Sequence, residues 1–142
     1  MLRLARVVIY AEIQVPLFGA AVCAGFPSPA EDWIEETIDP AALLIANRPA
    51  TFLMRVDGAS MVDVGIFDKD IVVVDRSLDP RHGDIVVAVV DGKRSLKRLD
   101  MSGDVPRLSF ANASLPAFVA AELSDALIWG VVTWNLHRLR TR

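Results

Sequence analysis

The chain has 142 residues and a formal net charge of −3 at pH 7, with 53% hydrophobic and 23% charged residues. This length and composition predict one globular domain with an appendage and exclude a largely disordered chain. The slightly acidic balance excludes a surface that attracts nucleic acid everywhere. The single cysteine, Cys23, excludes an internal disulfide framework and is typical of a reducing cytoplasm.

The first residues have some features of a secretory signal. Arg3 and Arg6 precede an apolar run, and Val22-Cys23-Ala24 offers small residues at a point of cleavage. Polar residues and a proline interrupt the run from Glu12 onward, so it is shorter than the roughly 7–15 residues that a signal needs. No stretch approaches the roughly 20 apolar residues of a membrane span. We therefore expect a cytoplasmic protein without a membrane anchor.

Residues 1–29 show no steady helical or strand period, and three prolines and two glycines interrupt them. We expect an extended N-terminal arm, because extended chain can enter a cleft as a strand whereas a helix would hide its peptide bonds. Residues 30–142 are expected to form the main β domain.

Two short helices are predicted near residues 30–47. Residues 28–31 have the spacing of a capping box, which predicts a helix through residues 31–36. A second short helix is predicted over residues 41–46, with Asp39-Pro40 at its start.

From Thr51 onward the sequence has the pattern of many short strands. Phe52, Met54 and Val56 alternate with the residues between them, which is the two-residue period of a strand. Asp91-Gly92 is a strong hairpin signal, because both turn positions need positive φ. The predicted strands cover residues 51–57, 71–74, 84–90, 94–99, 107–110 and 126–134. We therefore predict a mostly β fold, a curled antiparallel β domain.

Ser60 stands on a glycine-bearing turn, Asp57-Gly58-Ala59-Ser60-Met61, directly after the first of these strands. A serine hydroxyl becomes an effective nucleophile when a base removes its proton. The oxyanion that then develops needs backbone N–H groups aimed at it, and those of Ala59 and Ser60 are the candidates. Taken alone, such a turn is also compatible with a purely structural role.

Two residues are candidates for the base. His82 with Asp84 would complete a triad with Ser60, although a solvated loop histidine is the simpler interpretation. Lys97 is the alternative, and by strand alternation it shares a face with Ser95. A general-base lysine must be neutral, so its ordinary pKa near 10.4 has to be lowered by burial, by roughly three units. The competing interpretation of Lys97 is an edge-strand lysine that discourages aggregation.

Other chemistries find no support in the sequence. One cysteine, two distant histidines and no acidic cluster of ligand spacing predict neither a metal site nor a cofactor. The tryptophans are scattered without basic residues between them, which suits packing better than base stacking. The basic residues 137–142 are interpreted as a solvated tail.

Four motifs, in order along the chain, are shared with a known family. They are Gly25-Phe26-Pro27-Ser28-Pro29-Ala30, Gly58-x-Ser60-Met61, His82-Gly83-Asp84-Ile85-Val86 and Leu96-Lys97-Arg98-Leu99. Through them the chain resembles the LexA-like self-cleaving Ser/Lys peptidases and, among these, the UmuD-type accessory proteins of translesion synthesis. The resemblance runs from residue 16 to near the end, and it implies a mostly β fold with a movable N-terminal arm.

The same resemblance implies roles for the site residues. Ser60 is the nucleophile, Lys97 is the general base, and the bond that is cut is Ala24–Gly25. It also implies an autoproteolytic serine peptidase of the SOS DNA-damage response, stimulated by a RecA filament on single-stranded DNA. The shortened form would be the accessory homodimer of an error-prone Y-family translesion DNA polymerase. Cutting within one subunit and cutting between two remain equally open.

Some alternatives are weighed against this interpretation. Residue 59 is alanine where similar sequences often have aspartate, a change that we expect to alter the surface more than the chemistry. Only 24 residues precede Gly25, too few for a helix-turn-helix domain, so direct sequence-specific DNA binding is not expected. The main rival is a non-catalytic polymerase-binding β module in which Ser60 and Lys97 are vestigial.

Overall fold

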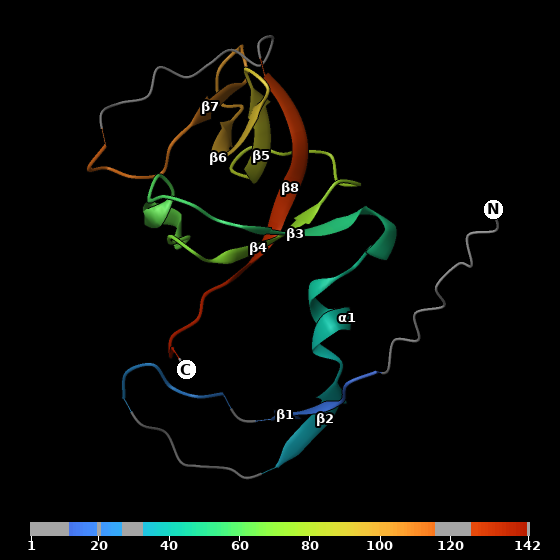
Figure 1. Ribbon diagram of the computed structural model, residues 1–142. Helices are drawn as coiled ribbons and strands as arrows, with labels where there is room; N and C mark the ends of the chain where they lie inside the picture. Colours follow the sequence, from blue (N-terminus) through green and yellow to red (C-terminus); the bar gives the residue numbers. More distant parts are fainter. Residues whose placement is uncertain (1–11, 20, 27–32, 116–125, 142) are drawn as a thin grey trace, which may run out of the picture. The chain divides into compact units, whose positions relative to one another are not determined.

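The structure is a computed structural model that describes residues 12–19, 21–26, 33–115 and 126–141. By its internal contacts the chain divides into two compact units, Met1–Leu44 and Ile45–Arg142. We call them unit 1 and unit 2 and describe each by itself (Figure 1). The predicted boundary between arm and β domain, at residue 29, lies outside the described residues.

Unit 1 contains a two-stranded antiparallel sheet made of β1 (Val15–Phe18) and β2 (Ile34–Ile38). In the register of this pair, Val15 lies opposite Ile38. The helix predicted through residues 31–36 is therefore wrong, because β2 occupies the second half of that range. β2 begins and ends with β-branched isoleucine, and its pairing with β1, distant in sequence, overrides the local capping signal. The capping residues 28–31 lie outside the described part of the chain.

The second predicted helix is confirmed as α1 (Pro40–Leu44), which begins and ends slightly earlier than expected. Its first turn is capped by Asp39, whose Oδ1 accepts a hydrogen bond of 2.9 Å from the backbone N–H of Ala41. Pro40 suits the first helical position, where a backbone N–H would have no partner in the helix. After α1, unit 2 opens with a single 3₁₀ turn, η1 (Arg48–Ala50).

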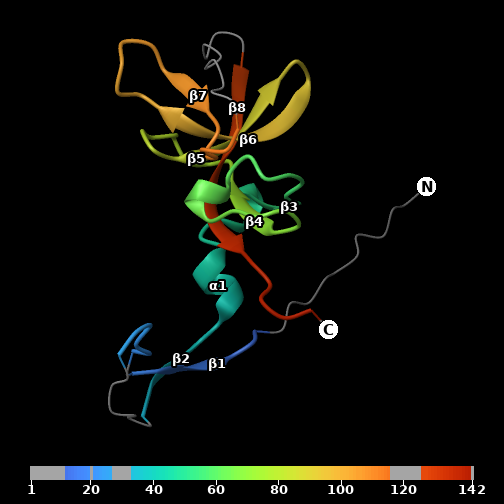
Figure 2. The ribbon, with the colours of Figure 1, turned by 90° about the vertical axis from the view of Figure 1, so that its left-hand side faces the viewer.

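Unit 2 is built on one six-stranded sheet in the order β3-β4-β8-β5-β6-β7, in which every neighbouring pair is antiparallel. Figure 2 shows how strongly this sheet curls. The curled antiparallel domain predicted from the sequence is confirmed. Its elements are β3 (Thr51–Arg55), η2 (Val62–Val64), β4 (Ile71–Asp75), β5 (Ile85–Val90), β6 (Lys93–Asp100), β7 (Arg107–Ser109) and β8 (Ala126–Leu136).

The predicted hairpin between β5 and β6 is also confirmed. Val90 pairs with Lys93, so the connection consists of Asp91 and Gly92 alone. Both residues have positive φ, 50° and 73°, as a two-residue turn of this hand requires.

The core of unit 2 has two apolar clusters, one on each face of the curled sheet. β5 contributes to both: Val87 packs into the first cluster, while Val86 and Ala88 pack into the second. Successive side chains of a strand point to opposite faces, so a strand that is buried on both faces must be continuously apolar. The uninterrupted apolar sequence of β5 meets this requirement.

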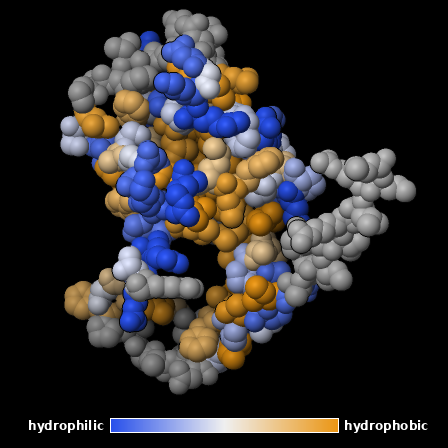
Figure 3. Space-filling view, in the orientation of Figure 1, coloured by the Kyte–Doolittle hydropathy of each residue, from blue (hydrophilic) through white to orange (hydrophobic). Residues whose placement is uncertain are grey.

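Unit 2 also presents apolar side chains to solvent. Figure 3 shows hydrophobic residues gathered over β3 and β8. The large exposed side chains of these two strands are Phe52, Leu53, Leu127, Trp134 and Leu136. Among the described residues, no helix has both the length and the apolar character to cross a membrane.

Candidate active site

Ser60 lies on the loop that connects β3 to η2. Gly58 has a φ of 100°, a backbone conformation that side chains with a Cβ rarely adopt, and it turns the chain sharply after the strand. The N–H of Gly58 donates a 2.7 Å hydrogen bond to Oδ1 of Asp68, which holds the start of the loop. The glycine-bearing turn expected here is present, and Ser60 is half-buried in it.

Ser60 lines a pocket of about 220 Å³ together with Ser95 of β6. Apolar residues from four strands and the segment after β3 form much of the wall, while the charged lining residues are exposed to solvent. The other lining residues are Met54, Arg55, Val56, Asp57, Val72, Val87, Arg94 and Leu96. The apolar part of this wall makes the surroundings of the serine less polar, and electrostatic interactions are stronger in less polar surroundings.

Lys97 is buried, with 6% of its surface exposed. Its Nζ donates a hydrogen bond of 2.8 Å to Ser95 Oγ and lies 4.6 Å from the centre of the Phe110 ring. Burial lowers the pKa of the Lys97 amine, because desolvation disfavours its charged form. The predicted common face of Lys97 and Ser95 is confirmed. The edge-strand interpretation is wrong, because β6 lies between β5 and β7 and this side chain points inward.

The structure thus brings Ser60 and Ser95 to the wall of one pocket and places Lys97 one hydrogen bond from Ser95. No role in the site is predicted for Ser95 from the sequence alone. Its spacing of two residues from Lys97 on one strand could have indicated it, because that spacing puts both side chains on the same face. Ala24 and Gly25 are exposed and belong to unit 1, whereas the pocket belongs to unit 2.

His82 and Asp84, the alternative partners for Ser60, have other contacts. Nδ1 of His82 accepts a 2.9 Å hydrogen bond from the N–H of Met101, and Asp84 accepts one of 2.8 Å from the N–H of Arg81. Neither residue lines the pocket that contains Ser60. Lys97 does not line it either, but its hydrogen bond to Ser95 connects it to the pocket wall, and neither His82 nor Asp84 has such a bond among the described contacts.

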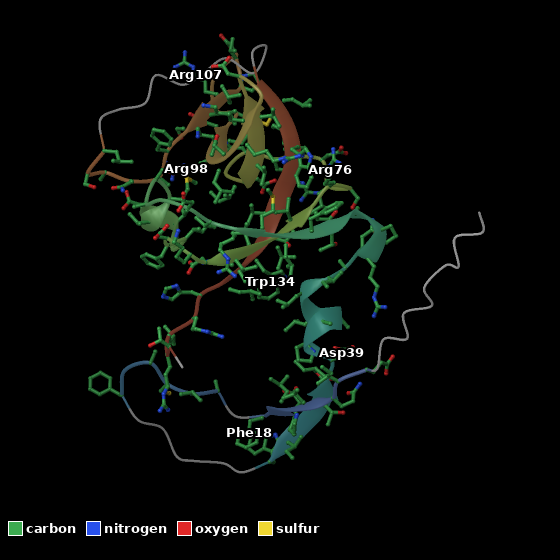
Figure 4. The ribbon with its side chains drawn as sticks, in the orientation of Figure 1. Phe18, Asp39, Arg76, Arg98, Arg107 and Trp134 are labelled. Carbon is green, nitrogen blue, oxygen red and sulfur yellow. The ribbon has the colours of Figure 1, made fainter. Side chains whose placement is uncertain are left out.

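Arg94, at the edge of the pocket, is attached to the centre of the sheet through Trp129 of β8. Its guanidinium lies 5.2 Å from the centre of the indole ring, and that of Arg76 lies 4.4 Å from it. Arg76 is itself held by a 2.9 Å hydrogen bond from its Nε to the Trp129 carbonyl, and Figure 4 shows it beside β8. Trp129 also packs, partly buried, against the first core cluster, and its two basic neighbours come from other strands or loops of the chain.

The tail predicted to be solvated is exposed over residues 137–141, but its first residue, His137, also contacts a buried carboxylate. Nδ1 of His137 lies 2.5 Å from Oδ1 of Asp70, a carboxylate that is only 3% exposed. Burial alone would raise the pKa of Asp70, but hydrogen bonds from Asn135, His137 and the N–H of Phe67 outweigh it, so that the pKa is lowered. The C-terminal end of β8 is thereby tied to the loop before β4, while the residues after His137 are exposed.

Comparison with known proteins adds to this geometry. Residues 16–133 match the Peptidase S24-like family. ImpA of Escherichia coli is 41% identical over 88% of this chain and 85% of its own length. MucA of the same species is 37% identical over 87% of this chain and 84% of that protein. The LexA repressor of Caldicellulosiruptor saccharolyticus is 39% identical over 89% of this chain and 60% of that protein. These relationships support a serine peptidase with a role in the SOS response. The chain belongs to the Peptidase S24-like family.

Proposed function

We propose that this protein is a self-cleaving serine peptidase that cuts its own Ala24–Gly25 bond, with Ser60 as nucleophile and Lys97 as general base. One observation carries the proposal. A buried lysine with a lowered pKa donates a hydrogen bond to Ser95, which lines the same pocket as Ser60. A lowered pKa increases the neutral fraction of the amine, and only the neutral amine can accept a proton.

The reaction then follows the general course of acyl transfer. Neutral Lys97 removes the proton of Ser60 as Oγ attacks the carbonyl carbon of Ala24, and the N–H groups of Ala59 and Ser60 stabilise the oxyanion. When the C–N bond breaks, the amine of Gly25 takes up the proton from Lys97. A water molecule then attacks the acyl-serine, which releases the carboxylate of Ala24 and regenerates Ser60.

Self-cleavage needs restraint, because a tethered substrate has a high effective concentration. We propose that residues 1–29 form a movable arm that reaches the pocket in only a fraction of molecules. A RecA filament on single-stranded DNA would raise the rate by favouring the docked arm, which is a population shift. This part would be wrong if RecA filaments left both the cleavage rate and the position of the arm unchanged.

For the shortened chain we propose the role of a homodimeric accessory subunit of a Y-family translesion DNA polymerase. The family relationship to ImpA and MucA supports this part of the proposal. The exposed apolar side chains of β3 and β8 offer surface for such association.

The test is the intact mass of the purified full-length chain after incubation at alkaline pH or with RecA, an ATP analogue and single-stranded DNA. Alkaline pH should suffice without RecA, because it neutralises Lys97. We expect a new fragment that begins at Gly25 in the wild type. Ser60→Ala and Lys97→Ala should each reduce its rate of formation by at least about 10³-fold while the fold survives.

Two results would count against the proposal. A wild type that stays uncut under both conditions would favour the non-catalytic polymerase-binding module. Equal cutting in Ser60→Ala and in the wild type would show that another protease cleaves the chain.

A further inference from the structure

The segment that follows β7 is hydrogen-bonded to the loop that carries Ser60. The N–H of Ala111 donates to the carbonyl of Ser60 at 2.9 Å, and the N–H of Asp63 donates to the carbonyl of Ala111 at 2.8 Å. The N–H of Ala113 donates to Oδ2 of Asp63 at 2.7 Å. The side chain of Asn112 adds a fourth bond, from Nδ2 to the carbonyl of Ala59 at 2.6 Å. Residues 111–113 thus hold the loop on both sides of Ser60.

The bond from Asn112 fixes one particular peptide group. The carbonyl of Ala59 and the N–H of Ser60 belong to the same planar trans peptide, in which they point in opposite directions. A donor that holds this carbonyl therefore also fixes the direction of the Ser60 N–H, away from Asn112. Within the described part of the chain, no backbone or side-chain acceptor is hydrogen-bonded to that N–H.

The orientation of the Asn112 amide is determined by its other contacts. Its Oδ1 accepts hydrogen bonds from the N–H of Ser114 at 3.0 Å and from Ser114 Oγ at 2.7 Å. A backbone N–H can only donate, so the oxygen of the amide must face Ser114. The nitrogen then faces Ala59, where a carbonyl can only accept.

We propose that Asn112 is a positioning residue for the oxyanion hole, because it orients the peptide whose N–H, at Ser60, stabilises the transition state. The inference rests on the proposed self-cleavage and adds a residue to its machinery. The side-chain hydrogen bonds described for Asn112 go to Ala59 and Ser114, so it is not itself one of the reacting groups. Its effect passes through the Ala59–Ser60 peptide, so that it should change the rate of the chemical step rather than the protonation of Lys97.

The test measures the first-order rate of self-cleavage against pH for Asn112→Ala and Asn112→Asp in the full chain. Aspartate retains an oxygen for the bonds from Ser114 but places a second oxygen, instead of an N–H donor, against the Ala59 carbonyl. Removal of a direct oxyanion donor reduces rates by about 10²–10³-fold. For this indirect effect we expect a plateau rate that is lower by about 10- to 100-fold in both variants.

The pH profile separates this role from a merely structural one. In Asn112→Ala the midpoint of the alkaline rise should stay at the wild-type pH, because the variant leaves the surroundings of Lys97 intact. Asp63→Ala is the matched control, because it removes another bond between the same two segments without touching the Ala59–Ser60 peptide. Asp63→Ala should keep a plateau rate within about twofold of the wild type. Its loss of stability in urea unfolding should be similar to that of Asn112→Ala.

The possible failures are distinguishable. If the wild type does not cut at all, the proposed function itself is wrong. If the wild type cuts and Asn112→Asp cuts equally fast, the positioning role is wrong. A plateau that falls as much in Asp63→Ala as in Asn112→Ala would reduce the role of Asn112 to general attachment of the loop. A shifted midpoint with an unchanged plateau in Asn112→Ala would show that it acts on Lys97.

Discussion

At the scale of single residues, Lys97 links stability to chemistry. Its burial lowers the pKa of the amine, so that a larger fraction is neutral at any given pH. Its hydrogen bond to Ser95 holds the amine beside the pocket that contains Ser60. The feature that suits Lys97 to act as a base therefore also burdens the folded state with a desolvated cation at neutral pH.

This burden should be visible in the pH dependence of stability. Between the lowered pKa of Lys97 and the ordinary value near 10.4, the folded chain binds fewer protons than the unfolded chain, so this group makes the free energy of unfolding rise with pH. Below that window the desolvation cost is present in full. We expect Lys97→Met to raise the free energy of unfolding at pH 7 and to raise it less at pH 10.

Urea unfolding of both proteins at the two pH values is the measurement. A gain of the same size at pH 7 and pH 10 would contradict a lowered pKa. Lys93→Met, at the exposed end of the hairpin, is the control and should show no such dependence on pH.

At the scale of elements, the close crossing of β8 and β4 depends on a glycine. A Cβ added to Gly130 would lie 2.7 Å from Cγ1 of Val74, a side chain that is fully buried. The register between β8 and its neighbours shifts next to this point, between Val87 and Ala88 on β5. Gly130 thus allows β8 to approach the buried side chain of Val74 closely at the point where its register shifts.

We therefore expect Gly130→Ala to lower the free energy of unfolding by about 1–3 kcal/mol, because overpacking forces buried side chains and backbone apart. Gly103→Ala is the matched control: a Cβ there would meet nothing closer than 4.0 Å, and we expect a change below about 0.5 kcal/mol. Thermal or urea unfolding measures both. Equal stability of the two variants would show that β8 can move away from β4 without loss.

At the scale of the whole molecule, the position of the proposed cut matters for unit 1. The Ala24–Gly25 bond lies between β1 and β2 in the sequence, so cutting leaves the two strands joined only by non-covalent contacts. A two-stranded sheet is marginally stable even when its strands are connected. Unit 2 has its own core and does not share this dependence.

We expect residues 1–24 to dissociate after cutting, and the amides of β2 then to lose protection against hydrogen exchange. The amides of β4, β5 and β8 should keep theirs. The comparison is between cut wild type and uncut Ser60→Ala, followed by mass spectrometry. Persistent protection of β2 after removal of the fragment would contradict this expectation.

Most of unit 2 and part of its site follow from local patterns in the amino-acid sequence. Alternation and β-branched runs predict the strands, Asp91-Gly92 predicts the hairpin, and the two-residue period places Lys97 on the face of Ser95. These features are determined by residues that are close to one another in the chain, so the amino-acid sequence alone is enough to predict them.

Other features arise only from contacts between residues far apart in the chain. β2 is a strand because β1 pairs with it, although the sequence around it has a helix signal. β8 lies between β4 and β5, and Asn112 reaches the peptide before Ser60 from 53 residues away. His137 is held at the end of β8 because a buried carboxylate 67 residues away, Asp70, accepts its hydrogen bond. In each case the free energy comes from a partner that no local pattern specifies, so the folded chain was needed to reveal it.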